Sequence, residues 1–76
     1  MPKLPVISGK KAIATLTKLG FKAVRQRGSH IVLKKKASDG FVVCVVPLHR
    51  ELAIGTLNGI LHQARVEAVE FIDALK

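Results

Sequence analysis

The stretch KAVRQRGSHIVLKKKASDGFVVCVVP, residues 22–47, decides the fold of this chain. It consists of three strand-like runs separated by two turns, and the runs lie at residues 22–26, 30–35 and 41–46. Gly-Ser at 28–29 forms a tight first link, and Ser-Asp-Gly at 38–40 has the composition of a second turn. The third run ends at Pro47, which has no N–H group to donate to a sheet. The stretch therefore predicts a three-stranded antiparallel sheet built from two hairpins.

Alternation along the second run assigns its side chains to the two faces of the sheet. Ile31 and Leu33 share one face of this strand. The other face carries His30, Val32 and Lys34. We expect the apolar pair to face the helices, which leaves His30 and Lys34 on the open face. A surface catalytic or binding residue requires this kind of exposure.

The third run, from Phe41 to Val46, is apolar without alternation. Such a run is typical of a strand that is buried on both faces, so we expect it to be central or covered on both sides. An open edge on this strand would favour aggregation, and a covering partner would remove that hazard. We also expect all three phenylalanines to pack against helices, which leaves the open face without an aromatic side chain for stacking on bases.

A helical pattern precedes the sheet region. Ser8 is suited to cap a first helix, because its hydroxyl can accept a hydrogen bond from the first turn. The apolar stripe of this helix consists of Ala12, Ile13, Leu16 and Leu19. Gly20 followed by the apolar Phe21 predicts that the helix ends in a Schellman arrangement.

Two further helical patterns follow the sheet region. After a loop at 48–52, a second helix begins near Ile54 or Gly55, and Gly59 within it weakens the pattern. Its apolar stripe consists of Leu57, Ile60, Leu61 and Ala64. A short third helix is predicted within 66–75. The chain is therefore predicted to adopt an α+β fold of α-β-β-β-α order, with helices packed on one face of the three-stranded antiparallel sheet.

The charge of the chain is large and unevenly distributed. The formal net charge is +8 over 76 residues. Residues 1–50 contain eleven Lys and Arg residues and one acid, whereas residues 51–76 contain two basic and four acidic residues. A field of this kind draws polyanions and gives salt-sensitive affinity, although the charges also suit an ordinary solvated surface.

Length and cysteine content restrict the class of protein. A chain of 76 residues is sized for one small domain, which we assign to residues 1–76. Cys44 is the only cysteine, so no intrachain disulfide forms, and we expect a buried, inert thiol. A lone cysteine without a secretory leader fits a reducing, cytoplasmic setting. No apolar run approaches the roughly 18 residues of a membrane span, so we expect no membrane partner.

Three blocks of the sequence together resemble a known family. They are RQRGSH at 25–30, VPLH at 46–49 and GTLNGILHQA at 55–64. Their order and spacing closely resemble those of the HicA-type toxins of bacterial and archaeal toxin–antitoxin pairs. The resemblance extends from about residue 8 to residue 71. One departure is Arg65, because many relatives have glycine there, so we expect a different turn or a longer second helix.

The resemblance implies a double-stranded-RNA-binding-domain-like fold and a toxin that blocks translation by cutting mRNA. It also implies a cognate HicB-type antitoxin that holds the toxin inactive. We accordingly expect a monomer when free and a hetero-oligomer with the antitoxin. By the same resemblance His30 occupies the position of the catalytic histidine, and family members need no metal or organic cofactor.

The residues themselves fit the chemistry of RNA cleavage. RNA carries its own nucleophile, the 2′-hydroxyl, so a minimal ribonuclease needs a base, an acid and cations. A histidine can serve as base or acid near neutral pH, which suits His30. Cations that could stabilise the phosphorane are Arg25, Arg27 and Lys34. Backbone N–H groups at Gly28 and Ser29 could add donors, because glycine lets a phosphate approach the main chain.

Other roles remain open at the level of the sequence. His49 is either an auxiliary acid–base group or a structural loop histidine, and His62 is expected to face solvent. Ser29 is not expected to pair with His30 as a nucleophile, because neighbouring strand residues point to opposite faces. The alternatives to a ribonuclease toxin are a non-cleaving RNA-binding module of the same fold and an interaction domain that binds an antitoxin.

Overall fold

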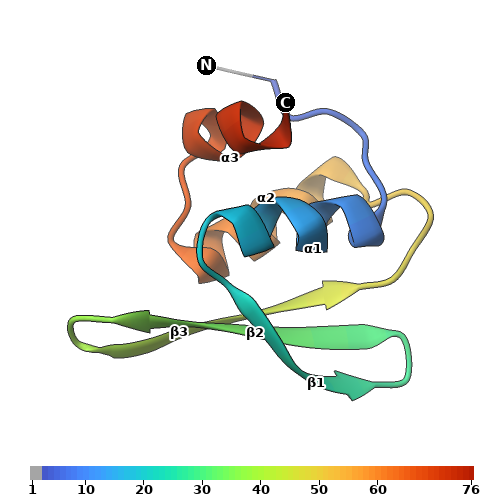
Figure 1. Cartoon of the computed structure of the whole chain (residues 1–76). Coiled ribbons are helices and arrows are strands. Elements are labelled where there is room, and N and C mark those ends of the chain that lie inside the picture. Colours follow the sequence, from blue (N-terminus) through green and yellow to red (C-terminus); the bar gives the residue numbers. More distant parts are fainter. Residues whose placement is uncertain (1–2) are drawn as a thin grey trace.

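A computed structural model describes residues 3–76 as one sheet covered by three helices (Figure 1). The elements are α1 (Gly9–Lys18), β1 (Lys22–Arg27), β2 (His30–Ala37), β3 (Gly40–Pro47), α2 (Ile54–Ala64) and α3 (Ala68–Leu75). The strands form an antiparallel sheet in the order β1-β2-β3. The three helices lie on one side of this sheet, and α3 lies beyond α1 and α2 as seen from the sheet (Figure 1). The predicted α+β fold is confirmed, and so is the short third helix predicted within 66–75.

The hydrophobic core lies between the sheet and the helices. The sheet contributes Ile31, Leu33, Val42, Cys44 and Val46. The helices and their connections contribute Ala12, Leu16, Phe21, Leu52, Leu57, Ile60, Leu61, Ala64, Val66 and Phe71. Side chains on the opposite face of β2, among them His30, are not part of this core. The predicted division of β2 into a buried and an open face is therefore confirmed. Within residues 3–76, none of the helices combines the length and apolarity that crossing a bilayer requires.

Both ends of α1 form the caps that the sequence predicts. The Oγ of Ser8 accepts a hydrogen bond from the Lys11 backbone N–H at 3.0 Å. At the other end, the Phe21 N–H donates to the Leu16 carbonyl and the Gly20 N–H donates to the Thr17 carbonyl, both at 3.1 Å. This pair of bonds is the Schellman motif, and Gly20 provides its left-handed residue with a φ of 101°. The cap turns the chain from α1 into β1.

The position of β3 differs from the prediction. β2 is the central strand, and β3 is an edge strand that pairs with β2 alone. Val42, Cys44 and Val46 face the core, whereas Phe41 and Val43 are 57% and 47% exposed on the open face. The expectation of a strand covered on both sides was wrong because apolar residues occupy its open face as well as its buried face. Apolarity without alternation does not distinguish the two situations.

Arg65 adopts the conformation that a glycine would normally have at this turn. It caps α2 with a φ of 57° and a ψ of 39°, so α2 ends at Ala64 and does not run on. Its guanidinium Nη1 lies 3.3 Å from a carboxylate oxygen of Asp39, in the turn between β2 and β3. Of the two expectations, the longer second helix was therefore wrong. A left-handed conformation costs a residue with a side chain about 1–2 kcal/mol. An exposed ion pair of this kind contributes only about 0–1 kcal/mol, so it offsets part of that cost.

The start of α1 lies against the backbone that follows β3. The Gly9 N–H donates to the His49 carbonyl at 2.9 Å. A Cβ at Gly9 would overlap the Pro47 carbonyl oxygen and would lie only 3.1 Å from the Leu48 Cα. Glycine is therefore required here by the closeness of two backbones and not by an unusual φ.

Replacing Gly9 by alanine is predicted to lower the free energy of unfolding by about 1–3 kcal/mol, because the added methyl group must push two main chains apart. Gly59→Ala is the matched control. A Cβ at Gly59 meets nothing within 4 Å, so this helix-interior change is expected to stabilise the protein by about 0.5–1 kcal/mol. Urea unfolding followed by circular dichroism measures the change in the free energy of unfolding for both variants. An equal change in Gly9→Ala and Gly59→Ala would contradict the close approach of Gly9 to the Pro47 carbonyl.

Cys44 is a structural residue of the core. Its side chain is buried, and this burial raises the pKa of the Cys44 thiol to about 11. At pH 8 only about one thiol in a thousand would then be ionised. The prediction of a buried thiol is confirmed.

Labelling with a disulfide reagent such as DTNB at pH 8 is predicted to be at least about 100-fold slower for the folded protein than for the protein in urea, because Cys44 needs both exposure and ionisation to react. The absorbance of the released thiolate follows the reaction. Fast labelling without denaturant would show that β3 separates from the helices under native conditions.

Candidate functional site

The open face of the sheet carries a group of cationic side chains from two neighbouring strands. We call it the basic face, and it consists of Lys22, Arg25 and Arg27 of β1 with His30, Lys34 and Lys36 of β2. Cross-strand partners share a face, and the pairs Lys22–Lys34 and Arg27–His30 bring these residues together. Arg25 stands opposite Val32 on the same face. The predicted site residues of β1 and β2 are thus gathered on one surface.

A bulge in β1 is needed for this arrangement. The register shifts between Ala23 and Arg25, which leaves Val24 as the extra residue. Lys22 and Arg25 are three positions apart, so in a regular strand they would point to opposite faces. The bulge brings Arg25 and Arg27 onto the same face as Lys22. Lys22 was missed in the sequence because regular alternation does not place it beside the other two.

His30 begins β2 directly after the first tight turn. Gly28 has a φ of 58°, which a residue with a side chain rarely adopts. The side chain of Gln26 donates from Nε2 to the Gly28 carbonyl at 3.0 Å and braces the turn. His30 is exposed, and it lies between Arg27 on one neighbouring strand and Pro47 on the other. The turn therefore holds the histidine at the end of the basic face.

The loop after β3 lies against this same turn. The Leu48 N–H donates to the Ser29 carbonyl at 2.6 Å, so residues 28–30 and 47–49 are joined directly. His49 follows Leu48 and belongs to a surface hollow between this loop and the start of α1. The residues that line the hollow are Ser8, Lys10, Leu48, His49 and Arg50. The structure thus brings His30 and His49 to the same corner of the molecule, beside the cations of the hollow.

Lys34 lies on the open face, as predicted, but its amino group is directed toward β3. The Lys34 Nζ lies 4.0 Å from the centre of the Phe41 ring, a distance that gives a cation–π contact. Phe41 therefore does not pack against a helix, and the expectation that the open face lacks an aromatic side chain was wrong. The ring was misplaced because β3 was taken to be covered on both faces.

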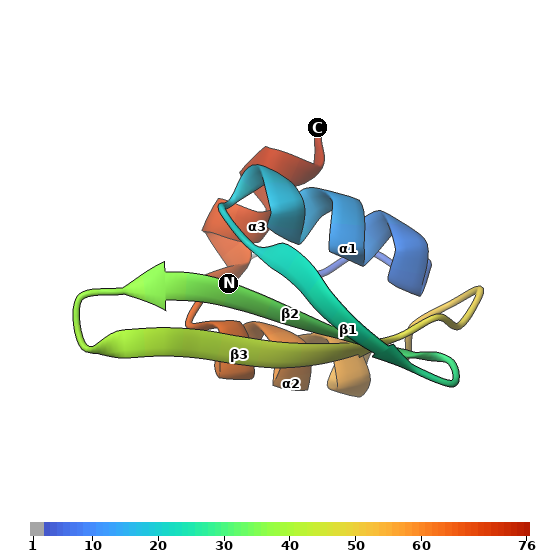
Figure 2. The same cartoon turned by 60° about the horizontal axis from the view of Figure 1, so that its bottom comes forward.

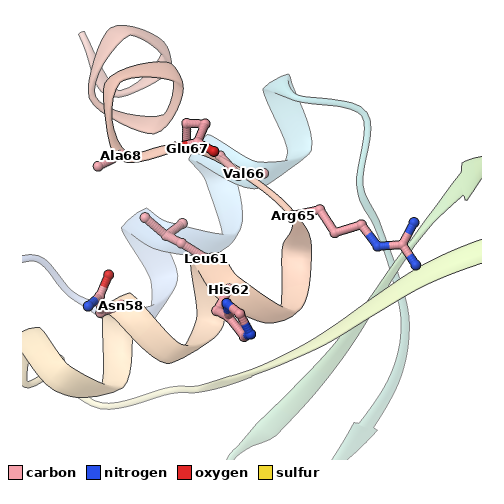
Figure 3. Close-up of a pocket in the computed structure, with 7 residues that line it drawn as sticks. All are labelled: Asn58, Leu61, His62, Arg65, Val66, Glu67 and Ala68. Atoms are coloured by element: carbon pink, nitrogen blue, oxygen red, sulfur yellow. The ribbon is translucent and has the colours of Figure 1, made fainter.

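A second pocket lies on the helical side, between α2 and α3 (Figure 3). Its lining consists of Asn58, Leu61, His62, Arg65, Val66, Glu67 and Ala68. Figure 3 shows the Arg65 side chain extending away from this pocket toward the strands. There its guanidinium forms the ion pair with the Asp39 carboxylate. His62 is exposed, as predicted. Within residues 3–76, no group of three or more His, Cys, Asp or Glu side chains is arranged to hold a metal ion.

Comparison with protein-family models gives one match that covers most of the chain. The model described as the HicA toxin of bacterial toxin–antitoxin systems matches residues 9–66. This range includes α1, the whole sheet and α2, and with them every residue of the basic face and both histidines of the corner. No curated protein matches the chain. The chain belongs to the HicA toxin family of toxin–antitoxin systems.

Proposed function

We propose that this toxin is an endoribonuclease that cleaves mRNA, with His30 as a general acid–base group. The observation that carries the proposal is the place of His30, which is exposed at the end of the basic face and next to Arg27. A phosphate bound by the cations of this face would lie within reach of an imidazole. The family resemblance adds that the reaction needs neither a metal ion nor an organic cofactor.

The chemistry requires two proton transfers. The 2′-hydroxyl attacks the neighbouring phosphorus and loses its proton to a base, and a 2′,3′-cyclic phosphate forms. The bond from phosphorus to the 5′-oxygen breaks, and an acid gives that oxygen a proton. Imidazole serves in either role near neutral pH. In this proposal Arg25 and Arg27 stabilise the extra negative charge of the phosphorane, and such electrostatic stabilisation is often the largest catalytic contribution.

His49 is the best candidate for the second proton-transfer group. The hydrogen bond between Leu48 and Ser29 places its loop beside the turn that precedes His30. The hollow that His49 lines also contains Lys10 and Arg50, two cations that suit a second phosphate of the RNA chain. Either histidine is able to act as the base, with the other as the acid.

Replacing His30 by alanine is predicted to lower the rate of mRNA cleavage by about 10²–10⁴-fold, because a positioned acid–base group is lost. His62→Ala is the control, since His62 is also exposed but lies on α2, away from the basic face. Each protein is induced alone in a bacterial host, and growth and the integrity of a reporter mRNA are followed. We expect arrest and cleavage with the wild type and His62→Ala only.

Two other results would contradict the proposal in different ways. If the wild type and His30→Ala cut RNA equally, His30 is not catalytic. If all proteins are soluble and none cuts RNA or stops growth, the chain is a non-cleaving RNA-binding module or an interaction domain. Direct binding of the purified protein to RNA then separates these last two functions.

Replacing Arg27 by alanine is predicted to weaken RNA binding and to reduce the slope of log K against log salt by about 0.7 for a single strand, because one phosphate contact is lost. The measurement uses a fluorescent RNA and the His30→Ala background, in which the substrate stays intact. Lys11→Ala is the control, because Lys11 is exposed on α1, outside the basic face. Equal slopes for Arg27→Ala and Lys11→Ala would show that the RNA does not bind at Arg27 on the basic face.

A further inference from the structure

The outer edge of β3 is closed along only part of its length. β3 pairs with β2 on one side, and α2 runs alongside it near the other (Figure 2). The Val45 N–H donates across this gap to the side-chain Oε1 of Gln63 on α2, at 3.2 Å. Pro47, two residues further on, has no N–H to satisfy. The second half of the edge is therefore protected.

The first half of the same edge has no such cover. In an antiparallel strand every second residue directs its N–H and C=O to the same side, so Phe41 and Val43 direct theirs outward, as Val45 does. Among residues 3–76 no side chain accepts a hydrogen bond from either N–H. The turn between β2 and β3 projects beyond the helices, so α2 does not shield this part of the strand (Figures 1 and 2). We call the backbone from Phe41 to Val43 the open edge.

The side chains beside the open edge are apolar and flanked by cations. Phe41 and Val43 are 57% and 47% exposed on the open face of the sheet. Their cross-strand partners on β2 are Lys36 and Lys34. A strand edge with free backbone donors and exposed apolar side chains is a template for another strand.

We infer that the open edge is where the antitoxin of this toxin binds, by adding an extended, acidic segment to β3 as a fourth strand. The inference rests on the toxin function for the existence of the partner, but not on the catalytic role of His30. Backbone hydrogen bonds to Phe41 and Val43 would supply the register, and contact with the two side chains would bury apolar surface. Acidic residues at alternate positions of the added strand would lie across Phe41 and Val43 from β2, about 10 Å from its backbone, within reach of its long lysine side chains.

Charge selects an acidic partner over a second copy of this chain. Each copy has a net charge of +8, and pairing two β3 edges would bring Lys34 and Lys36 of both copies onto one face. These lysines would lie about three strand spacings, or about 14 Å, apart, so they and the net charge of each copy oppose the pairing most strongly at low ionic strength. An acidic strand meets the same lysines with the opposite sign, and the field of the basic face speeds its approach.

Occupation of the open edge would also affect the RNA site. The added strand lies next to β3, about 5 Å further out, and continues the open face on which the basic face lies. Its carboxylates would neutralise Lys34 and Lys36 and would repel the phosphates of an incoming RNA. A partner bound at this edge therefore inhibits the toxin without a direct contact to His30.

The test compares Val43→Lys with Val24→Lys, both in the His30→Ala background so that the host survives. Val24 is the matched control, because it is also an exposed valine, at 52%, but belongs to β1 at the opposite edge of the sheet. The partner used is the protein encoded by the reading frame that adjoins this chain's gene, and calorimetry gives the dissociation constant. We expect Val43→Lys to weaken binding by at least about 30-fold, and Val24→Lys by less than about 3-fold.

Hydrogen exchange gives a second readout that needs no change in β3. The amides of Phe41 and Val43 are expected to exchange rapidly in the free His30→Ala protein and at least about 10-fold more slowly in the complex. Equal binding by both lysine variants, or unchanged exchange at the two amides, would overturn the inference. Self-association of the free protein that is lost in Val43→Lys would show that a second copy occupies the edge.

Growth assays separate this inference from the proposed function. With an active His30, the wild type and Val24→Lys are expected to be neutralised by the co-expressed partner, whereas Val43→Lys escapes and stops growth. If the wild type alone does not stop growth, the ribonuclease proposal fails, while the calorimetry still tests the edge. If Val43→Lys alone has lost RNA cleavage, the open edge belongs to the RNA site and the inference fails.

Discussion

The direct contact between the backbone of the first turn of α1 and the backbone that follows β3 is the constraint on which the arrangement of the molecule depends. The Gly9 N–H bonds to the His49 carbonyl, and the Leu52 N–H bonds to the Ile7 carbonyl at 2.8 Å. The same loop also bonds to the turn before His30. Three segments that are distant in sequence therefore meet at one corner. Because these bonds join main chains, the corner is positioned by the fold and not by the side chains that would carry out the chemistry.

The features that could be predicted from the sequence are those fixed by neighbouring residues. Ser8 and Gly20 specify the two ends of α1 through local hydrogen bonds, and the alternation around His30 fixes its face because a strand has a period of two. The three motif blocks predicted the family, because their order and spacing together are more specific than any one block. The element bounds agree with the predicted runs to within about two residues, the usual uncertainty at element ends.

The features that could not be predicted depend on contacts between distant segments. Nothing local distinguishes an apolar edge strand from a buried one, so Phe41 was assigned to the wrong face. The bulge at Val24 changes the face of every later residue in β1, and it is seen only in the pairing with β2. Gly9 resembles any glycine near a helix start, and its necessity becomes clear only from the Pro47 carbonyl beside it. The same is true of Gln63, which reaches the edge of β3 from α2.

The attachment of α3 has a consequence for the dynamics of the chain. In the described structure Phe71 is the only residue of this helix that is buried, and a hydrogen bond from the Lys18 Nζ to the Ala74 carbonyl, at 3.1 Å, ties down its end. The family match ends at residue 66, before the helix begins. Exposing Phe71 costs about 1.5–3 kcal/mol and exposing the partly buried Leu75 adds less than that, so the sum stays below most of the 5–15 kcal/mol range of typical global unfolding. We therefore regard α3 as the segment that opens first, as a unit, while the sheet and its two histidines stay folded.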